Sequence, residues 1–131
     1  MGTRYSGRDL YVSFNGTTLS YVRSIGDNDE AAEIDASASG DTREFYLAGL
    51  ISGDFDGEML DDDTTNDNYN AVAPQTTGTL IIAPQGTASG KRKITYSQTV
   101  MLTRGRTYPY RDVVVISFSG RLNSAPTLGT Y

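Results

Sequence analysis

The stretch GDNDEAAEIDASASGDTREFYLAGLISG, which runs from Gly26 to Gly53, decides how the whole chain is interpreted. It lies between two strand-like segments, yet it carries few large apolar residues and shows no clear hydrophobic period. A compact domain rarely contains so long a polar connection unless the connection has a function or is disordered. Small Ala and Ser residues alternate here with charged ones, a pattern that suits contact with another protein chain better than a ligand pocket. The candidate contact residues are Asp29, Glu30, Glu33, Ile34, Asp35, Arg43, Glu44 and Phe45.

Segments with the alternation typical of β-strands flank this stretch on both sides. Residues 10–14 alternate apolar and polar side chains, and Asn15-Gly16 is a strong hairpin signal. A second strand is expected at Thr17–Ile25. Further strands are expected at Leu50–Leu60, Thr79–Ala83, Arg92–Leu102 and Asp112–Gly120. The chain of 131 residues is therefore expected to be one all-β domain, a β-sandwich or barrel with one short helix.

Alternation within these strands separates an apolar face from a polar one. The residues expected to share apolar faces are Ile51, Phe55 and Met59 in one strand, Ile94, Tyr96, Val100 and Leu102 in another, and Val114, Ile116 and Phe118 in a third. On the opposite face of Leu50–Leu60, the carboxylates of Asp54, Asp56 and Glu58 form a row about 13 Å long. This row is either solvated outer surface or, if it points into the bore of a ring, a negative wall that repels phosphates.

Two segments lie outside the strands. The acidic residues 61–63 suit the start of a helix, because carboxylates are stabilised near the positive end of the helix dipole. Pro74 limits the length of that helix, so we expect a short helix within residues 61–73. The C-terminal residues 123–131 include Pro126 and Gly129 and are expected to form an extended arm.

Charge divides the chain into an acidic and a basic half, although its net charge is only −5. Residues 1–67 contain 15 acidic and 4 basic residues, a net −11, whereas residues 68–131 contain 1 acidic and 7 basic residues, a net +6. Either this is chance patterning of a solvated surface, or the opposite charges steer identical copies into head-to-tail contact, which repeated along an axis builds an open filament. The candidate complementary basic residues are Lys91, Arg92, Lys93, Arg104 and Arg106.

The composition provides little for catalysis or for metal binding. The chain has no His and no Cys, so it lacks an imidazole base, an ordinary nucleophilic triad and any thiolate ligand. We therefore expect no enzyme activity and no cofactor. The aspartates at 61–63 and 67 lack the spacing and the glycine of a calcium loop, so helix capping explains them better than a weak calcium site does. No apolar run approaches a membrane span, and the N-terminus lacks a signal peptide core, so a soluble protein made in the cytoplasm is expected.

Several short pieces of this sequence stand in the order and spacing found in one family of viral proteins. These pieces are Ala32-Glu33-Ile34-Asp35-Ala36-Ser37, Arg43-Glu44-Phe45, Gly49-Leu50 and Gly53, followed by the strand and turn at 78–87. In this pattern the chain resembles the tail tube (major tail) proteins of long-tailed bacteriophages. The resemblance spans nearly the whole chain and rests on the pattern as a whole, because no single motif in it is diagnostic.

The resemblance implies a structural role in a virion tail. Tail tube proteins form hexameric rings in which the sheets of neighbouring subunits join into one β-barrel, and the rings stack into a tube through which viral DNA leaves. The segment matching their inter-ring loop is 26–48. The resemblance further implies a tape-measure protein, a tail terminator and distal tail proteins as partners, with no sequence-specific DNA binding and no membrane. The chain departs from the family in its short length, in the absence of an immunoglobulin-like domain, and in a loop richer in Ala and Ser.

Other classes of protein remain alternatives at this point. A head–tail connector ring and a capsid decoration protein are also virion proteins, and tail-completion proteins share related β folds. A tube subunit of a contractile injection or secretion system is a second alternative. The basic cluster 91–93 is too short for sequence-specific DNA binding. A carbohydrate-binding module is a weaker option, because the nine Tyr show no spacing pattern and Trp is absent.

Overall fold

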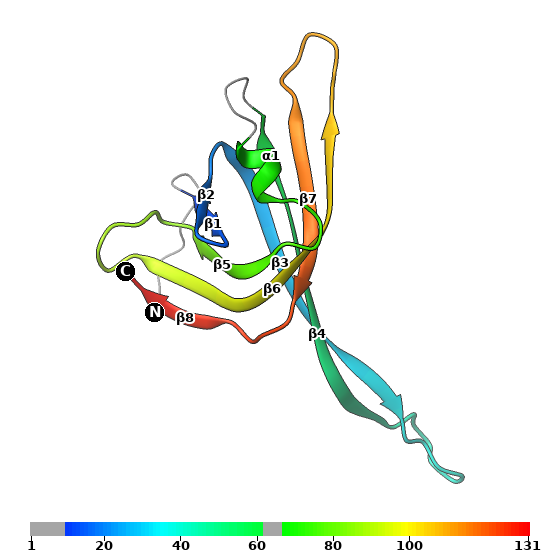
Figure 1. Ribbon diagram of the computed structural model, residues 1–131. Helices are drawn as coiled ribbons and strands as arrows, with labels where there is room; N and C mark the ends of the chain where they lie inside the picture. Colours follow the sequence, from blue (N-terminus) through cyan, green and yellow to red (C-terminus); the bar gives the residue numbers. More distant parts are fainter. Residues whose placement is uncertain (1–9, 62–66) are drawn as a thin grey trace.

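The computed structural model describes residues 10–61 and 67–131, and it is almost entirely antiparallel sheet (Figure 1). Its elements are β1 (Tyr11–Phe14), β2 (Thr17–Leu19), β3 (Val22–Asp35), β4 (Tyr46–Leu60), α1 (Asp67–Ala71), β5 (Thr77–Ala83), β6 (Arg92–Thr107), β7 (Val115–Leu122) and β8 (Thr127–Thr130). The expected all-β class with one short helix is confirmed. The acidic residues 62 and 63, expected to open the helix, lie outside the described residues.

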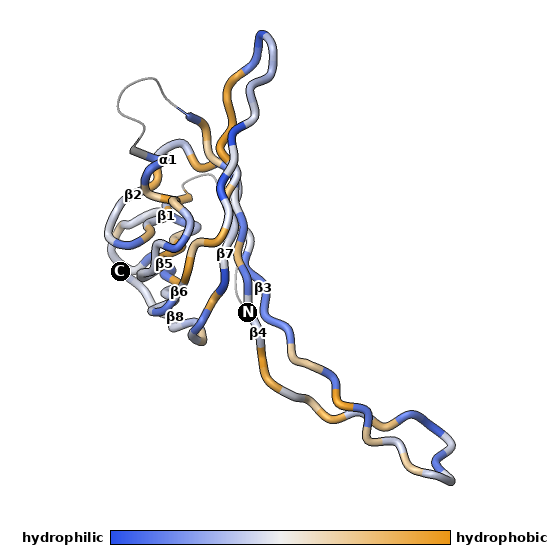
Figure 2. Tube along the Cα trace, turned by 45° about the vertical axis from the view of Figure 1, so that its right-hand side comes forward, coloured by the Kyte–Doolittle hydropathy of each residue, from blue (hydrophilic) through white to orange (hydrophobic). Residues whose placement is uncertain are grey.

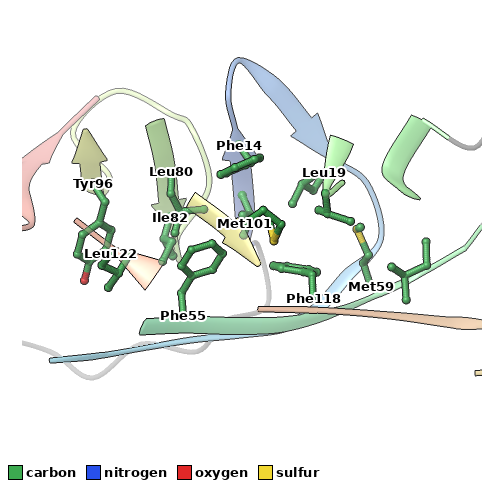
Figure 3. Packing of buried hydrophobic residues seen from close by; sticks show 13 residues of the cluster. Phe14, Leu19, Phe55, Met59, Leu80, Ile82, Tyr96, Met101, Phe118 and Leu122 are labelled. Atoms are coloured by element: carbon green, nitrogen blue, oxygen red, sulfur yellow. The ribbon is translucent and has the colours of Figure 1, made fainter. Parts of the chain in front are cut away.

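All eight strands belong to one curled sheet. Its order is β2-β1-β5-β6-β7-β4-β3, and β8 also pairs with β6. The long strand β6 takes part in both halves of the sheet, because its first part pairs with β5 and β8 and its second part pairs with β7. The half that contains β4 and β7 therefore faces the half that contains β1 and β5 across the core (Figure 3). In a single chain this sheet is open, with β2 and β3 at its ends.

The first hairpin turns where the sequence predicts it. Asn15 and Gly16 both have positive φ, 50° and 80°, as the type I′ turn between twisted strands requires. The predicted continuous strand Thr17–Ile25 is wrong, because Tyr21 has a φ of 58° and separates β2 from β3. A residue in the left-handed region cannot continue the extended ladder, so the chain changes direction there.

The core lies between the two halves of the curled sheet. Phe55 and Phe118 reach from β4 and β7 towards Phe14 of β1, with ring centroids 6.4 Å apart for Phe14–Phe55 and 6.5 Å apart for Phe55–Phe118 (Figure 3). Met59 and Ile116 are also fully buried, so the predicted apolar faces of β4 and β7 are correct within the body of the protein.

The predicted apolar face of β6 is wrong beyond Tyr96. The pairing of β5 with β6 shifts by one residue between Gly78 and Leu80, and a second shift separates Met101 from Thr103 in the pairing with β7. Each shift places an extra residue in β6 and exchanges the faces of the residues that follow it. Met101 is therefore buried where alternation predicts Val100 and Leu102.

Two segments expected to lack regular pairing are strands. The predicted loop at 26–48 is mostly the paired ends of β3 and β4, which continue to Asp35 and Tyr46 with one register shift between Ala31 and Glu33. Only residues 36–45 connect them. The predicted C-terminal arm 123–131 contains β8, which pairs with the start of β6. Polar β-strands exposed on both faces need no apolar alternation, so the sequence pattern did not reveal them.

Candidate functional site

The paired ends of β3 and β4 form a ribbon that leaves the body of the protein. The pairing of β4 with β7 ends at Gly53, opposite Leu122, whereas its pairing with β3 continues to Tyr46. We call residues 30–52 the arm. Seven residues of β4 extend beyond the body, which corresponds to about 23 Å of strand. Figures 1 and 2 show this two-stranded ribbon projecting far from the curled sheet.

Apolar side chains continue along the arm past the point where the core ends. Met59, Phe55 and Ile51 occupy alternate positions of β4 and so share one face. Phe55 is 1% exposed and Ile51 is 75% exposed. A register shift between Ala31 and Glu33 places an extra residue in β4, so Leu47 lies on the other face. Ile34 lies directly opposite Leu47 on the same face. We call Ile34, Leu47 and Ile51 the apolar arm residues; they are exposed on both faces of the ribbon, and exposed apolar surface of this kind marks interaction sites.

Hydrogen bonds within the far end of the arm give its turn a defined shape. The Asp35 carboxylate accepts from the Ser37 backbone N–H at 2.9 Å, and the Ser37 hydroxyl accepts from the Phe45 N–H at 2.7 Å. The first of these bonds lowers the pKa of Asp35. Asp41 accepts from the Ala38 N–H at 2.7 Å. Side chains thus replace the ladder bonds that the polar connection lacks.

The predicted contact residues all lie on the arm or at its base. Asp29 pairs with Gly53 where β4 leaves β7. The residues further along β3 are Glu30, Glu33, Ile34 and Asp35, and those at the far end are Arg43, Glu44 and Phe45. Glu44 accepts a hydrogen bond from the Tyr46 hydroxyl at 2.7 Å, which raises the pKa of Tyr46. Their role in contacts between subunits stays a prediction.

The side of β4 that faces away from the core is polar. Asp54, Asp56 and Glu58 are exposed there, as the alternation predicts. Their neighbours across the ladder on β7 are Arg121, Ser119 and Ser117. The hydroxyls of Ser119 and Thr103 of β6 are hydrogen-bonded to each other. We call this surface the polar face; whether it lines a bore stays a prediction.

The five basic residues predicted to complement the arm do not form one cluster. Lys91, Arg92 and Lys93 lie at the start of β6, beside β8, where the Lys93 ammonium is 4.9 Å from the Tyr131 ring. Arg104 and Arg106 lie near the other end of the strand.

Arg104 and Arg106 hold the helix against the sheet. Their guanidinium groups lie 4.0 and 3.9 Å from the ring centroid of Tyr69 in α1. Arg106 also pairs with Asp61 at 3.2 Å. Its pKa is raised, first by a hydrogen bond with Tyr108 and then by the Asp61 charge. These contacts give the two arginines a structural role within one subunit.

Sequence reasoning missed a second projecting hairpin. We call residues 108–114, between β6 and β7, the tip; it projects at the end of the sheet opposite the arm (Figure 1). Tyr108, Tyr110 and Val113 are exposed there, and Tyr110 is 87% exposed. The Arg111 guanidinium lies 5.2 Å from the Tyr110 ring. Two tyrosines around Pro109 in a turn are a signal that could have indicated an exposed aromatic surface.

A contact between β6 and β3 fixes the base of the arm. The buried Tyr96 donates a hydrogen bond to the carboxylate of Asp27, two residues before Asp29. Burial, together with this bond, raises the pKa of Tyr96. The tyrosine therefore joins the core to the strand that leaves it.

Within residues 10–61 and 67–131 there is no group of three or more acidic side chains placed to hold a metal ion. Two of the aspartates of the possible calcium site, Asp62 and Asp63, lie outside these ranges. No helix of the described chain is long and apolar enough to cross a membrane.

No protein-family model and no curated protein matches this sequence. The fold, a curled antiparallel sheet with one small helix and a long arm, nevertheless recurs in solved structures of tubes and tails. One match is a chain in the sheath/tube terminator of PVC, an extracellular contractile injection system in its extended state, with a TM-score of 0.76 and 9% identity over 98% of this chain and 99% of that one.

Two further matches come from tails. A chain in the tail of an empty gene transfer agent particle, refined helically with C6 symmetry, matches with a TM-score of 0.64 and 12% identity over 98% of this chain and 99% of that one. The SPP1 tail tube protein matches with a TM-score of 0.69 and 10% identity over 98% of this chain and 80% of that one. The resemblance to tail tube proteins is therefore confirmed at the level of the fold.

Proposed function

We propose that this protein is a tail tube subunit of a long-tailed bacteriophage or a related particle. Six copies form a ring, and stacked rings enclose a channel through which viral DNA passes. The observation that carries the proposal is a small curled sheet with a long unsupported arm, shared over nearly its whole length with the SPP1 tail tube protein. The sixfold symmetry of the gene transfer agent tail supports six copies.

Two open sheet edges support closure of such a ring. Among the described residues, no strand pairs with the outer edge of β3, or with residues 102–105 of β6 on the side away from β7. Strands β6, β7, β4 and β3 are successively antiparallel, so β6 and β3 run in opposite directions. The β3 edge of one copy beside β6 of the next would therefore continue the antiparallel ladder and remove both edges.

We further propose that the polar face lines the channel. Closure of the four strands into a barrel places one face inside, and the core occupies the other side of β4 and β7. The carboxylates of Asp54, Asp56 and Glu58 would then form a negative wall that repels phosphate groups. DNA would pass without sequence-specific binding. Localisation in the virion tail follows from this role.

The arm supports stacking, because it extends about 23 Å beyond the body and exposes apolar residues that its own subunit does not cover. It would contact the neighbouring ring. At the ends of the tube, terminator and distal tail proteins would meet the last rings, and a tape-measure protein would occupy the channel during assembly. None of these roles requires catalysis.

A tube subunit of a contractile injection system is the second candidate. The TM-score of 0.76 with a chain of the PVC sheath/tube terminator favours it. The subunit would again form stacked rings, but the channel would serve a different cargo. A head–tail connector or a decoration protein would also be structural, but neither would form long tubes on its own.

Electron microscopy of the purified, concentrated protein tests the proposal. The expected result is sixfold rings and hollow tubes of constant diameter. The matched control removes residues 31–51 and joins Glu30 to Ser52, which face each other, through an Asn-Gly turn. This variant should stay folded but form no tubes. If the unmodified protein remains monomeric or trimeric at all salt concentrations, the proposal is wrong.

A further inference from the structure

The arm and the tip project from opposite ends of the same strands. The arm begins beyond the Gly53–Leu122 pair of β4 and β7, and the tip begins beyond the Leu60–Val115 pair at the other end. Figure 1 shows the two hairpins pointing away from each other. In a head-to-tail stack of identical copies, the arm of one molecule therefore approaches the tip end of the next.

The base of the arm contains a place for an inserted side chain. A groove of about 640 Å³ opens where β7 separates from β4, and the exposed Ile51 lines it together with Leu122, Pro126, Asp29 and Arg121. The walls of the groove are mostly apolar. A flat aromatic ring with a polar end suits such a site, because it buries a large area and keeps its hydroxyl near polar groups.

The tip has the complementary chemistry. Tyr110 is its most exposed aromatic residue, and Arg111 beside it carries a positive charge. The Asp112 carboxylate accepts a hydrogen bond from the Val113 N–H at 2.7 Å and so turns back on its own backbone. The arm carries five acidic residues and one basic residue, a net −4 for residues 30–52. Residues 103–114 carry three basic residues and one acidic residue, a net +2. The net charge of this region stays positive when the charge of Asp61, which forms an ion pair with Arg106, is added to it.

We infer that the tip of one copy is the receptor for the arm of the next, with Tyr110 lying in the groove beside Ile51 and Arg111 facing the acidic arm. This inference rests on the proposed tube and names the partner of the arm within it. Because two different surfaces meet, the contact is heterologous, and its repetition builds an open filament. Opposite charges favour this pairing over contact between two arms or two tips.

Cross-linking between engineered cysteines tests the inference, since the natural chain has no Cys. Ile51→Cys and a tagged Tyr110→Cys variant are mixed, assembled and treated with a short bifunctional thiol reagent. A gel then separates the mixed dimer from dimers of either variant. We expect several-fold more mixed dimer than with Leu50→Cys, whose side chain points to the opposite face of β4. A second control pairs Ile51→Cys with Ser89→Cys in the exposed turn between β5 and β6.

The outcomes separate this inference from the proposed function. Tubes that form but cross-link Ile51→Cys equally well or better to Ser89→Cys would overturn the tip as receptor and leave the tube role intact. Tubes with no mixed dimer at all would do the same. If the unmodified protein forms neither rings nor tubes, both proposals fail together. As a second readout, Tyr110→Ser should lower the yield of tubes several-fold without changing the melting temperature of the subunit, because Tyr110 lies outside the core.

Discussion

The two halves of strand β4 show how differently one strand can be supported. From Gly53 to Met59 it pairs on both sides, with β3 and β7, and buries Phe55 and Met59 in the core. From Tyr46 to Ser52 it pairs with β3 alone, and Leu50 is 89% exposed. One strand therefore contributes to a core in one half, where β7 and the opposite part of the sheet pack against it, and forms an uncovered surface in the other half.

This difference separates the stability of the subunit from that of its assembly. A two-stranded ribbon without a covering layer is at best marginally stable in water. The body contains the buried cluster, so it accounts for the cooperative unfolding of the single chain. The arm gains its covering from another molecule in the proposed tube. Substitutions in the two halves should therefore affect different measurements.

The largest contrast is expected between Phe118→Ala in the body and Leu47→Ala on the arm. Phe118 is buried against Phe55, so its loss should lower the free energy of unfolding by about 3–5 kcal/mol. Leu47 is half-exposed on the arm, and its loss should cost less than about 0.5 kcal/mol in the isolated subunit. Urea denaturation followed by circular dichroism measures both. Equal losses would show that the arm and the body unfold as one unit.

The next contrast uses two glycines on neighbouring strands. A Cβ at Gly120 would lie 2.2 Å from the Val100 carbonyl oxygen and 2.8 Å from the Phe55 ring. Gly120→Ala should therefore force backbone and core to shift and destabilise the subunit by about 1–3 kcal/mol. A Cβ at Gly105 meets nothing within 4 Å, so Gly105→Ala is the matched control with no loss of thermal stability. An unchanged melting temperature for Gly120→Ala would contradict the close packing of β7 on Phe55.

A smaller effect is expected at the boundary between body and arm. Tyr96→Phe removes the hydrogen bond to Asp27 and should cost about 1 kcal/mol near neutral pH. Because the folded state raises the pKa of Tyr96, this contribution is complete below a pH of about 10 and declines as the pH rises beyond it. The difference in unfolding free energy between the two proteins should therefore narrow at alkaline pH. A constant difference would exclude ionisation of Tyr96 as its cause.

The smallest effect on the whole protein is expected at the far end of the arm. Asp35→Ala removes the acceptor for the Ser37 N–H, so amide exchange should accelerate in residues 36–45 while the melting temperature stays unchanged. The pKa of Asp35 is lowered, so the natural turn keeps this bond above a pH of about 4 and loses it as the pH falls through the lower folded value. Exchange rates measured by nuclear magnetic resonance test both statements. A changed melting temperature would mean that the turn is coupled to the core.

The parts of the fold that depend on local signals could be predicted from the sequence. Asn15-Gly16 specifies its hairpin through backbone conformation, and Phe55, Met59 and Phe118 follow from simple alternation. The bulges of β6 could not be predicted, because one extra residue reverses the faces without leaving a pattern. For the outer half of β3 the sequence predicts a loop, since a ribbon exposed on both faces does not select apolar residues.

The candidate surfaces could be predicted only in part. The arm was expected to contact another chain because of its composition, and the exposure of Asp54, Asp56 and Glu58 followed from their spacing. The tip is indicated only weakly: tyrosines around Pro109 suit an exposed turn, but tyrosines are also common in covered positions. The position of Arg104 and Arg106 around Tyr69 depends on α1 packing against the sheet, which brings together residues distant in the chain.

The way β4 enters the body also has a mechanical consequence. The arm is the direct continuation of this strand, so a tension applied to the arm acts along the ladder that joins β4 to β7. The backbone hydrogen bonds of the β4–β7 ladder, from the Gly53–Leu122 pair to the Leu60–Val115 pair, are then loaded in shear and share the force. A pull across the strands would instead break these hydrogen bonds one after another. A filament linked through such arms resists stretching through the strongest direction of each sheet.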